Sequence, residues 1–198
     1  YLHGLVRDER GRKMSKSLDN VIDPLDMIKL YGADATRLSL VIGSTPGNDS
    51  KLSEAKVAGY RNFTNKLWNI SRFVLSSVDR DATKVAKNPE PHTLTDRWIL
   101  SRLASLQLEV TKHLEAYEFS QAGEKLRDFT WGEFADWYLE IAKIQRLDST
   151  DAILLYILEN LLVLWHPFMP FETEDIWKHF SVPPLPERGL GGVGVTVL

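Results

Sequence analysis

Apolar residues in the second part of the chain recur every three or four positions, the spacing of a helix with one buried face. Residues 53–78 show this most clearly, because their apolar side chains form a single stripe. The last long run, residues 151–166, is apolar nearly all round, so we expect this helix to be the buried one. The pattern predicts a bundle of about five helices, over residues 53–78, 96–116, 120–147 and 151–166, with a short one from 173 to about 180.

Local signals place several helix ends. Asp23 and Pro24 form a typical helix start, because an N-cap acceptor precedes a proline at the first helical position. Gly32 is expected to end this short helix after Tyr31. Thr95 is expected to cap the long helix that begins near Asp96.

The N-terminal residues have a different pattern. Residues 2–14 predict a short hairpin in which Gly11 supplies the positive φ of the turn. A second short helix is expected over residues 34–42. Residues 43–50 are small, polar or turn-forming, so they are the best internal boundary. The glycine-rich end of the chain has no periodicity, and we expect residues 182–198 to be a flexible tail.

Composition excludes several classes of protein. The 198 residues include no cysteine, so disulfides, thiolate zinc sites and cysteine nucleophiles are excluded. No apolar run is long enough for a bilayer, so we expect no membrane role and take the cytoplasm as the default location. The chain begins with Tyr1, and we interpret it as part of something larger. Residues 1–80 hold 13 Lys and Arg against 9 Asp and Glu, so a polyanion should favour this half.

Residues 13–17 have the sequence Lys-Met-Ser-Lys-Ser, which resembles the signature loop of class I aminoacyl-tRNA synthetases. When an amino-acid carboxylate attacks the α-phosphorus of ATP, negative charge builds on the phosphorus oxygens and on the departing pyrophosphate. Two ammonium groups on a mobile loop can neutralise this charge. The resemblance implies catalytic roles for Lys13 and Lys16, with Lys16 contacting the triphosphate, and an ATP-binding role for Lys13, Met14, Ser15, Lys16 and Ser17. The alternative is a solvated basic turn.

The chain departs from this family in two respects. Asp19 stands where the family often has glycine, and because aspartate tolerates the left-handed conformation we expect altered loop stiffness and retained function. The family's His-Ile-Gly-His-like segment does not occur. The fragment alone is therefore expected to be inactive. ATP with Mg²⁺ would be a substrate of the parent enzyme, and we expect no tightly bound cofactor here.

Further segments resemble the valyl-specific branch of this family. Taken together they cover the chain up to about Phe180. The resemblance implies the end of an α/β nucleotide-binding fold at residues 1–45 and a helical anticodon-binding domain at residues 46–181. The segments are Pro46-Gly47-Asn48-Asp49, Leu52-Ser53-Glu54, Gly59-Tyr60-Arg61-Asn62-Phe63, Asn65-Lys66-Leu67-Trp68-Asn69, Trp137-Tyr138-Leu139-Glu140 and His166-Pro167-Phe168-Met169-Pro170-Phe171.

A helical wheel of residues 53–78 independently indicates an RNA-binding face. Amide and guanidinium groups fall on one polar arc opposite the apolar stripe, with an indole at its flank. Such groups can bind exposed base edges and phosphates, and an indole can stack on a base. The alternative is a solvated face whose tryptophan packs against the next helix. The candidate tRNA-binding residues are Arg61, Asn62, Asn65, Trp68, Asn69 and Arg72.

Other candidates favour structural interpretations. His166 is expected to be a hydrogen-bonded structural histidine at the end of a buried helix. Glu133, Asp136 and Glu140 share one helical face, but without a nearby His or Cys we expect a solvated face and no metal site. Three tryptophans outside the arc are interpreted as core or inter-helix anchors, namely Trp131, Trp137 and Trp165.

The resemblance implies a fragment of a valine–tRNA ligase. Its loop would assist valyl-adenylate formation, and its bundle would bind the valine-accepting tRNA near the anticodon. The partners expected are that tRNA and the remainder of the synthetase, in a monomeric parent. Two alternatives remain: an isoleucyl- or leucyl-type fragment, or a non-catalytic helical module that binds RNA or protein.

Overall fold

The computed structural model describes residues 1–78, 88–145 and 147–181, most of which are helical. The flexible tail predicted at residues 182–198 lies outside the described residues. None of the helices described is long and apolar enough to cross a membrane. The elements in chain order are β1 (Val6–Arg7), the 3-10 turn η1 (Lys16–Leu18), α1 (Pro24–Tyr31), α2 (Ala33–Val41), β2 (Ser50–Lys51), α3 (Glu54–Ser77), α4 (Leu94–Glu115), α5 (Phe119–Asp128), the π-helix η2 (Phe129–Tyr138), α6 (Leu139–Ile144), α7 (Asp148–Trp165), α8 (Pro170–Lys178) and the 3-10 turn η3 (His179–Ser181).

The N-terminal hairpin was wrong as a prediction. β1 pairs in parallel with β2, and an isolated bridge from Arg7 to Lys13 is what remains of the hairpin among the described residues. The Asp49 side chain explains this pairing, because its carboxylate accepts the Leu5 amide at 2.8 Å and contacts the Arg7 guanidinium. The turn itself forms as expected, with Gly11 at φ +79°.

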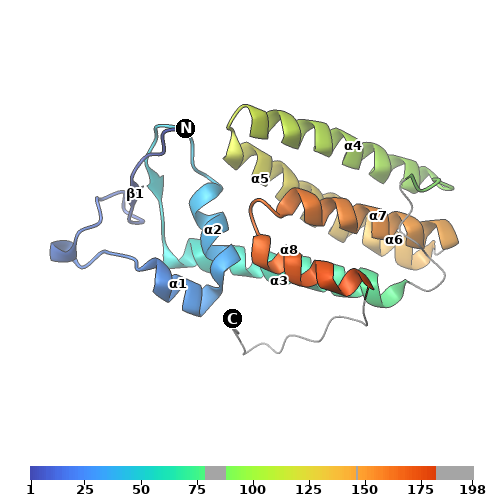
Figure 1. Ribbon diagram of the computed structural model, residues 1–198, viewed down its shortest axis with the longest axis horizontal. Helices are drawn as coiled ribbons and strands as arrows, with labels where there is room; N and C mark the ends of the chain where they lie inside the picture. Colours follow the sequence, from blue (N-terminus) through green and yellow to red (C-terminus); the bar gives the residue numbers. More distant parts are fainter. Residues whose placement is uncertain (79–87, 146, 182–198) are drawn as a thin grey trace.

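Gly4 is required where the first residues meet the segment before β2. A Cβ at Gly4 would lie 2.0 Å from the carbonyl oxygen of Asn48, closer than a side-chain atom and a backbone atom can approach. The turn-forming segment 43–50 is therefore attached to residues 1–7 by close backbone contact as well as by hydrogen bonds. In Figure 1 these two stretches lie side by side at the left of the molecule.

The cap expected for the first helix is confirmed, and α3 has a cap of the same kind. Asp23 accepts the Leu25 amide at 2.8 Å, and the helix ends at Gly32. α3 begins after Ser53, whose hydroxyl accepts the Lys56 amide at 3.2 Å. The sequence thus predicted both ends of α1 and, from its apolar stripe, the start of α3.

Three helix starts were wrong by two or three residues, and one of them is that of α7, which begins at Asp148 and not at residue 151. Thr93, not Thr95, caps α4: its hydroxyl accepts the Asp96 amide, while the Asp96 carboxylate accepts the Thr93 amide. This reciprocal pair satisfies two backbone donors at once, which favours the earlier start. α8 begins at Pro170, because a proline at the first helical position has no amide hydrogen left unsatisfied.

The helix expected over residues 120–147 is interrupted by η2. Phe129 and Phe134 are both buried, although residues five apart lie about 140° apart on an α-helix. The wider turn of a π-helix, in which the Leu139 amide donates to the Phe134 carbonyl, brings such residues onto one face. Burial of these two rings therefore explains the π-helical geometry.

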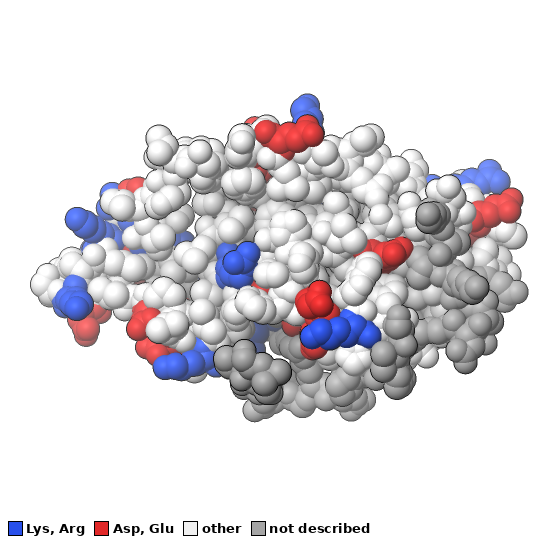
Figure 2. Space-filling view, in the orientation of Figure 1, with Lys and Arg blue, Asp and Glu red and all other residues white. Residues whose placement is uncertain are grey.

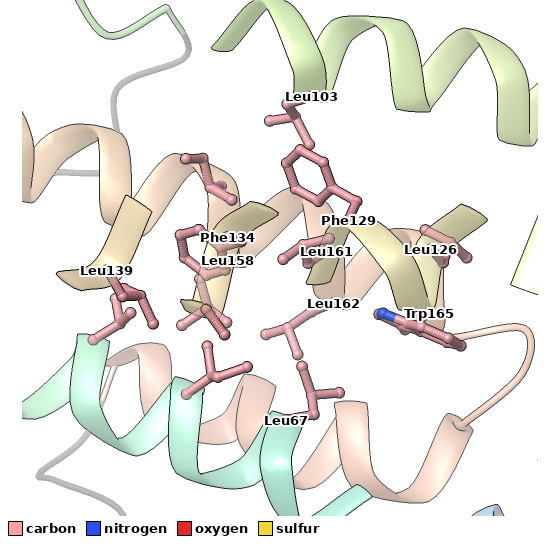
Figure 3. Packing of buried hydrophobic residues seen from close by; sticks show 14 of the residues in the cluster. Leu67, Leu103, Leu126, Phe129, Phe134, Leu139, Leu158, Leu161, Leu162 and Trp165 are labelled. Atoms are coloured by element: carbon pink, nitrogen blue, oxygen red, sulfur yellow. The ribbon is translucent and has the colours of Figure 1, made fainter. Parts of the chain in front are cut away.

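α7 lies at the centre of the bundle, as its apolar sequence predicts. α7 contacts α3, α4, α5 and α8, and the close-up in Figure 3 shows its leucines Leu158, Leu161 and Leu162 among Phe129 and Phe134 of η2 and leucines of α3 and α4. The buried Trp165 donates its indole N–H to the Thr130 hydroxyl at 3.0 Å. This bond satisfies the polar group of a fully buried ring.

Helix α2 connects the N-terminal part to the bundle. Arg37 donates to the carbonyls of Pro167 and Phe168, each at 3.2 Å, in the turn between α7 and α8. Asp34, three residues earlier, accepts the Glu172 amide at 2.6 Å at the start of α8. The lysine loop is thus held at a defined place relative to the bundle by contacts on both sides of one turn.

Candidate functional site

The lysine loop projects from the end of the molecule farthest from α4 and α6. It is the blue segment at the left of Figure 1. Lys13 follows directly after the turn at Gly11, and Lys16 begins η1. The side chains of Lys13, Lys16 and Ser17 are exposed, while Ser15 is half-buried. The loop therefore presents two ammonium groups and a hydroxyl to an incoming anion.

Met14 anchors the loop between its two lysines. It is half-buried and packs against a small apolar cluster of Met27, Ala35, Leu52 and Val57. Met27 lies on α1, Ala35 on α2 and Val57 on α3, whereas Leu52 lies between β2 and α3. The apolar residue of the motif thus fixes the loop to the helices, while the charged ones point to solvent.

Asn20 braces the loop backbone, a role that the sequence interpretation missed. Its side-chain oxygen accepts the Ser15 amide at 2.9 Å. Its side-chain nitrogen donates to the Lys13 carbonyl at 3.2 Å and to the Asp8 carboxylate at 3.0 Å. One amide group therefore closes the loop between Lys13 and Ser17 across its base. The signal was present as an asparagine three residues after the motif, but spacing alone did not connect it to Asp8.

Asp8 is the charged member of this brace. Its buried carboxylate also accepts the Arg12 amide at 2.7 Å and the Arg12 guanidinium at 2.8 Å. The hydrogen bond from Asn20, with support from Arg12, lowers the pKa of Asp8 to about 2. The carboxylate therefore stays ionised and holds both partners in place.

Asp19 ends η1 in the left-handed conformation, at φ 48° and ψ 36°. This agrees with the expectation that aspartate can occupy a position where relatives of this type have glycine. The Ser15 and Ser17 hydroxyls lie 3.1 Å apart. Backbone geometry and hydroxyl contacts thus shape the loop around its two lysines.

Polar residues of α3 form the second candidate site. Asn62 and Asn69 are exposed, and the other hydrophilic members of the arc are half-buried. All of them lie on one helix opposite its buried stripe, as the wheel predicted. The structure therefore brings together Arg61, Asn62, Asn65, Asn69 and Arg72 on one face, and their contact with RNA stays a prediction.

Trp68 requires a correction. Its side chain is only 3% exposed and belongs to the main core. The indole cannot offer a stacking face to a base, because both faces are covered by packing. The alternative interpretation, that this tryptophan packs against neighbouring helices, is the one that the structure supports.

The acidic set on η2 and α6 is fully engaged in ion pairs. Glu133 accepts two hydrogen bonds from Arg102, at 2.7 and 2.8 Å. Asp136 pairs with Lys66 at 3.1 Å, and Glu140 pairs with Lys143 at 2.6 Å. Within the described residues, no group of three or more His, Cys, Asp and Glu is arranged to hold a metal ion.

His166 has a structural partner, as expected. Its Nδ1 lies 2.8 Å from the Thr173 hydroxyl, which joins the end of α7 to α8. These two residues also line a hollow of about 290 Å³, together with Leu162, Val163, Pro167, Glu174 and Trp177. Figure 2 shows few charged side chains over this side of the molecule, where α7 and α8 lie.

The three tryptophans interpreted as anchors have different environments. Trp165 is a core residue, as expected. Trp131 is 39% exposed but lies against Phe63, 6.3 Å between ring centroids, and beneath the Lys66 ammonium. Trp137 is 64% exposed, so its interpretation as a core or inter-helix anchor is wrong. It lies between ion pairs on the outer side of η2, where none of the described helices covers it.

Two protein families match different parts of the chain. Residues 96–191 match the anticodon-binding domain of tRNA ligases. Residues 1–53 match the class I tRNA synthetases of the I, L, M and V group. The first match covers α4 to η3, and the second covers the lysine loop, α1, α2 and β2.

Curated relatives that resemble the chain are valine–tRNA ligases. The enzyme of Dehalococcoides mccartyi strain CBDB1 is 47% identical over 193 residues, covering 94% of this chain and 21% of the relative. That of Geobacter sulfurreducens is 49% identical over 189 residues, covering 90% of this chain and 21% of the relative. The chain thus spans about a fifth of the length of the relatives it matches.

Two solved structures share the fold at 24% identity. One is LeuRS of Agrobacterium radiobacter K84 in a ternary complex with tRNA and LeuAMS, with a TM-score of 0.74 over 91% of this chain and 22% of that one. The other is the methionyl-tRNA synthetase of Mycobacterium tuberculosis in complex with methionyl-adenylate, with a TM-score of 0.70 over 88% of this chain and 36% of that one. At this identity the likeness concerns the arrangement of helices.

Proposed function

We propose that this chain is part of a valine–tRNA ligase, since it belongs to the class I tRNA synthetases of the isoleucine, leucine, methionine and valine group. The observation that carries the proposal is 45–49% identity to valine–tRNA ligases over nearly the whole chain. This identity does not favour an isoleucyl- or leucyl-type enzyme or a non-catalytic module. The activity belongs to the parent protein, since the chain is about a fifth of such an enzyme.

The lysine loop would assist adenylate formation in the parent. Lys16 and Lys13 would neutralise charge on the triphosphate as the carboxylate of valine attacks the α-phosphorus and pyrophosphate departs. The geometry fits this role: the lysine side chains are exposed, whereas the backbone between them is held by Asn20 and Met14. A compact ammonium on a braced loop can meet a phosphate without reorganising its support.

Mg²⁺ would accompany ATP in the parent. Asp8, the carboxylate that braces the loop, already accepts hydrogen bonds from Arg12 and Asn20. We therefore expect Mg²⁺ to be held by the triphosphate and by residues outside this chain. The loop lysines would then act beside the metal as additional positive charge.

The helical bundle would bind the anticodon arm of the valine-accepting tRNA. The polar arc of α3 supports this, because amide groups of Asn62, Asn65 and Asn69 can hydrogen-bond base edges while Arg61 and Arg72 contact phosphates. A domain boundary after residue 45, a monomeric parent and a cytoplasmic location complete the proposal. Each of these remains an expectation from the sequence.

The lysine role can be tested in the intact parent enzyme with valine, ATP and labelled pyrophosphate. Lys16→Ala should lower the rate of pyrophosphate exchange by about 10²–10³-fold, the typical effect of removing one transition-state donor. Lys29→Ala is the matched control, since Lys29 is an exposed lysine on α1. Normal exchange by the Lys16 variant would overturn the assigned role.

The RNA role can be tested by binding of tRNA to the same enzyme. Asn62→Ala with Asn69→Ala should weaken binding of the valine tRNA about tenfold, while Gln121→Ala, an exposed amide on α5, should not. Salt dependence separates phosphate contacts from base contacts. Equal binding of valine, isoleucine and leucine tRNAs would contradict discrimination by the bundle.

A further inference from the structure

The segment between α2 and α3 holds β1, the strand that leads into the lysine loop. The Ser50 amide donates to the Leu5 carbonyl at 3.0 Å, and the Leu52 amide donates to the Arg7 carbonyl at 2.9 Å. Both bonds belong to the parallel pairing of β1 with β2. The segment thus follows β1 as far as Arg7, the residue directly before the turn that precedes the loop.

Asp49 is the acidic residue of this segment, and its two carboxylate oxygens have different partners on β1 and the residue before it. One oxygen accepts the Leu5 amide at 2.8 Å, and the other accepts the Arg7 guanidinium. These bonds lower the pKa of Asp49, with the bond from the Leu5 amide as the larger cause, so the carboxylate stays ionised at neutral pH. One side chain therefore holds both the backbone of this strand and the side chain at its end.

Arg7 extends this contact to the turn and to the first lysine of the motif. Its guanidinium also donates to the Gly11 carbonyl at 3.4 Å, and its backbone forms an antiparallel bridge with that of Lys13. Lys51 of β2 reaches the same turn, because a Cβ at Gly11 would lie 3.4 Å from its Cε. The turn before the loop is therefore contacted by side chains from both strands.

The ion pair of Asp49 and Arg7 should affect geometry more than stability. The two side chains are 33% and 34% exposed, and partly exposed pairs contribute little to the free energy of unfolding. A displaced catalytic group costs much more in rate, since a misplacement of about 1 Å can slow a reaction about 100-fold. Loss of the pair should therefore be measurable in the chemistry of the parent while the fold is retained.

We propose that Asp49 is a positioning residue for adenylate formation, which acts through Arg7 on the place of Lys13. The inference rests on the proposed function of the lysine loop. It is separate from the brace at Asn20, because Asn20 closes the loop on itself. Asp49 instead joins the strand before the loop to the segment that leads into α3, and so sets where the braced loop lies relative to the helices.

The test is valine-dependent pyrophosphate exchange by the intact parent enzyme. Asp49→Asn keeps an oxygen for the Leu5 amide but loses the charge that Arg7 binds. It should lower kcat about tenfold and leave KM for valine within about twofold of wild type, since the affected interaction forms in the transition state. Asp128→Asn is the matched control and should exchange as wild type does, since Asp128 also pairs with an arginine, at 3.3 Å, but lies at the end of α5.

A second substitution distinguishes positioning from an effect on folding. Lys13→Ala removes the group that Asp49 is proposed to place, so Asp49→Asn should cause little further loss in the Lys13→Ala enzyme. A substitution that only lowers the folded fraction would cause the same loss in both backgrounds.

Two results would overturn the proposal for Asp49. One is an unchanged kcat for Asp49→Asn, and the other is an equal loss with and without the Lys13 ammonium. Absence of valine-dependent exchange by the wild-type parent would instead contradict the proposed function.

Discussion

The Asp34 carboxylate accepts the backbone amide of Glu172 at 2.6 Å, and it thereby caps α8 from a helix 138 residues earlier in the chain. Burial raises the pKa of Asp34 in spite of this hydrogen bond. The carboxylate therefore contributes a cap at some cost in desolvation. Because Arg37 binds the carbonyls of the same turn, both residues join the loop-bearing part to the bundle.

Two substitutions of Asp34 should distinguish the contribution of its cap to the free energy of unfolding from the contribution of its charge. Asp34→Ala removes the acceptor and should lower the free energy of unfolding by about 1–2 kcal/mol, the usual effect of losing an N-cap. Asp34→Asn keeps an oxygen that can accept the Glu172 amide and removes the buried charge, so it should stay within about 1 kcal/mol of wild type at pH 7. Urea denaturation of the chain measures both, and equal losses would contradict a capping role.

Asp8 should make the loop region sensitive to acid. Its pKa is lowered from 3.8 to about 2 in the folded state, chiefly by the hydrogen bond from Asn20. A lowered pKa gives stability that is present above about pH 4 and is lost as the pH falls toward 2. The difference in unfolding free energy between wild type and Asp8→Asn should therefore shrink over this window. Asp26→Asn, an exposed carboxylate on α1, provides the comparison, and a difference independent of pH would argue against the brace.

Asn20 should matter for chemistry more than for stability. Asn20→Ala removes hydrogen bonds to the Ser15 amide, the Lys13 carbonyl and Asp8, so the loop loses its defined shape. In the parent enzyme we expect pyrophosphate exchange to fall about 10- to 100-fold, as for a misplaced catalytic group. tRNA affinity should be unchanged, since the bundle is untouched. Asn48→Ala tests an exposed amide of another loop, and a similar loss there would remove the special role of Asn20.

Tyr138 should be a stability residue. Its hydroxyl donates to the Asp96 carboxylate at 2.8 Å in the core, where burial and this hydrogen bond raise the pKa of the tyrosine. Tyr138→Phe leaves Asp96 with one donor fewer and should lower the free energy of unfolding by about 2 kcal/mol. Tyr117→Phe, at an exposed site, should have little effect on the free energy of unfolding. Calorimetry measures this free energy for both variants.

Local chemistry explains which helices the sequence could predict. Asp23 with Pro24 is a signal read within a few residues, and α1 begins where it was expected. The start of α3 likewise agrees with the start of its apolar stripe. The error at Thr95 was of the same local kind, since two threonines stand two residues apart and only the reciprocal bond with Asp96 decides between them. A sequence that is apolar nearly all round likewise identified α7 as the buried helix.

Pairings distant in sequence account for the errors. β1 pairs with β2 because Asp49 reaches Leu5 and Arg7, a contact across more than 40 residues that hairpin spacing cannot indicate. The lysine loop was recognised from its residues, whereas its brace required Asp8 and Asn20 to meet in space. Trp137 was interpreted in the opposite sense to its exposure, because helical periodicity was extended through a segment that is not α-helical. Trp68 lies on the α-helix α3 at the flank of the polar arc, and a helical wheel does not show which neighbouring helix covers that flank.

The wide turns of η2 also bear on how the length of this protein can change. A π-helix accommodates more residues than an α-helix over the same core face, so an additional residue can be absorbed without rotating the helices on either side. Loss of one residue near Gly132 would leave Phe129 and Phe134 four positions apart, which an α-helix places on one side. Homologous chains should therefore tolerate a gap of a single residue here, inside a buried helix, where such gaps are otherwise excluded by packing.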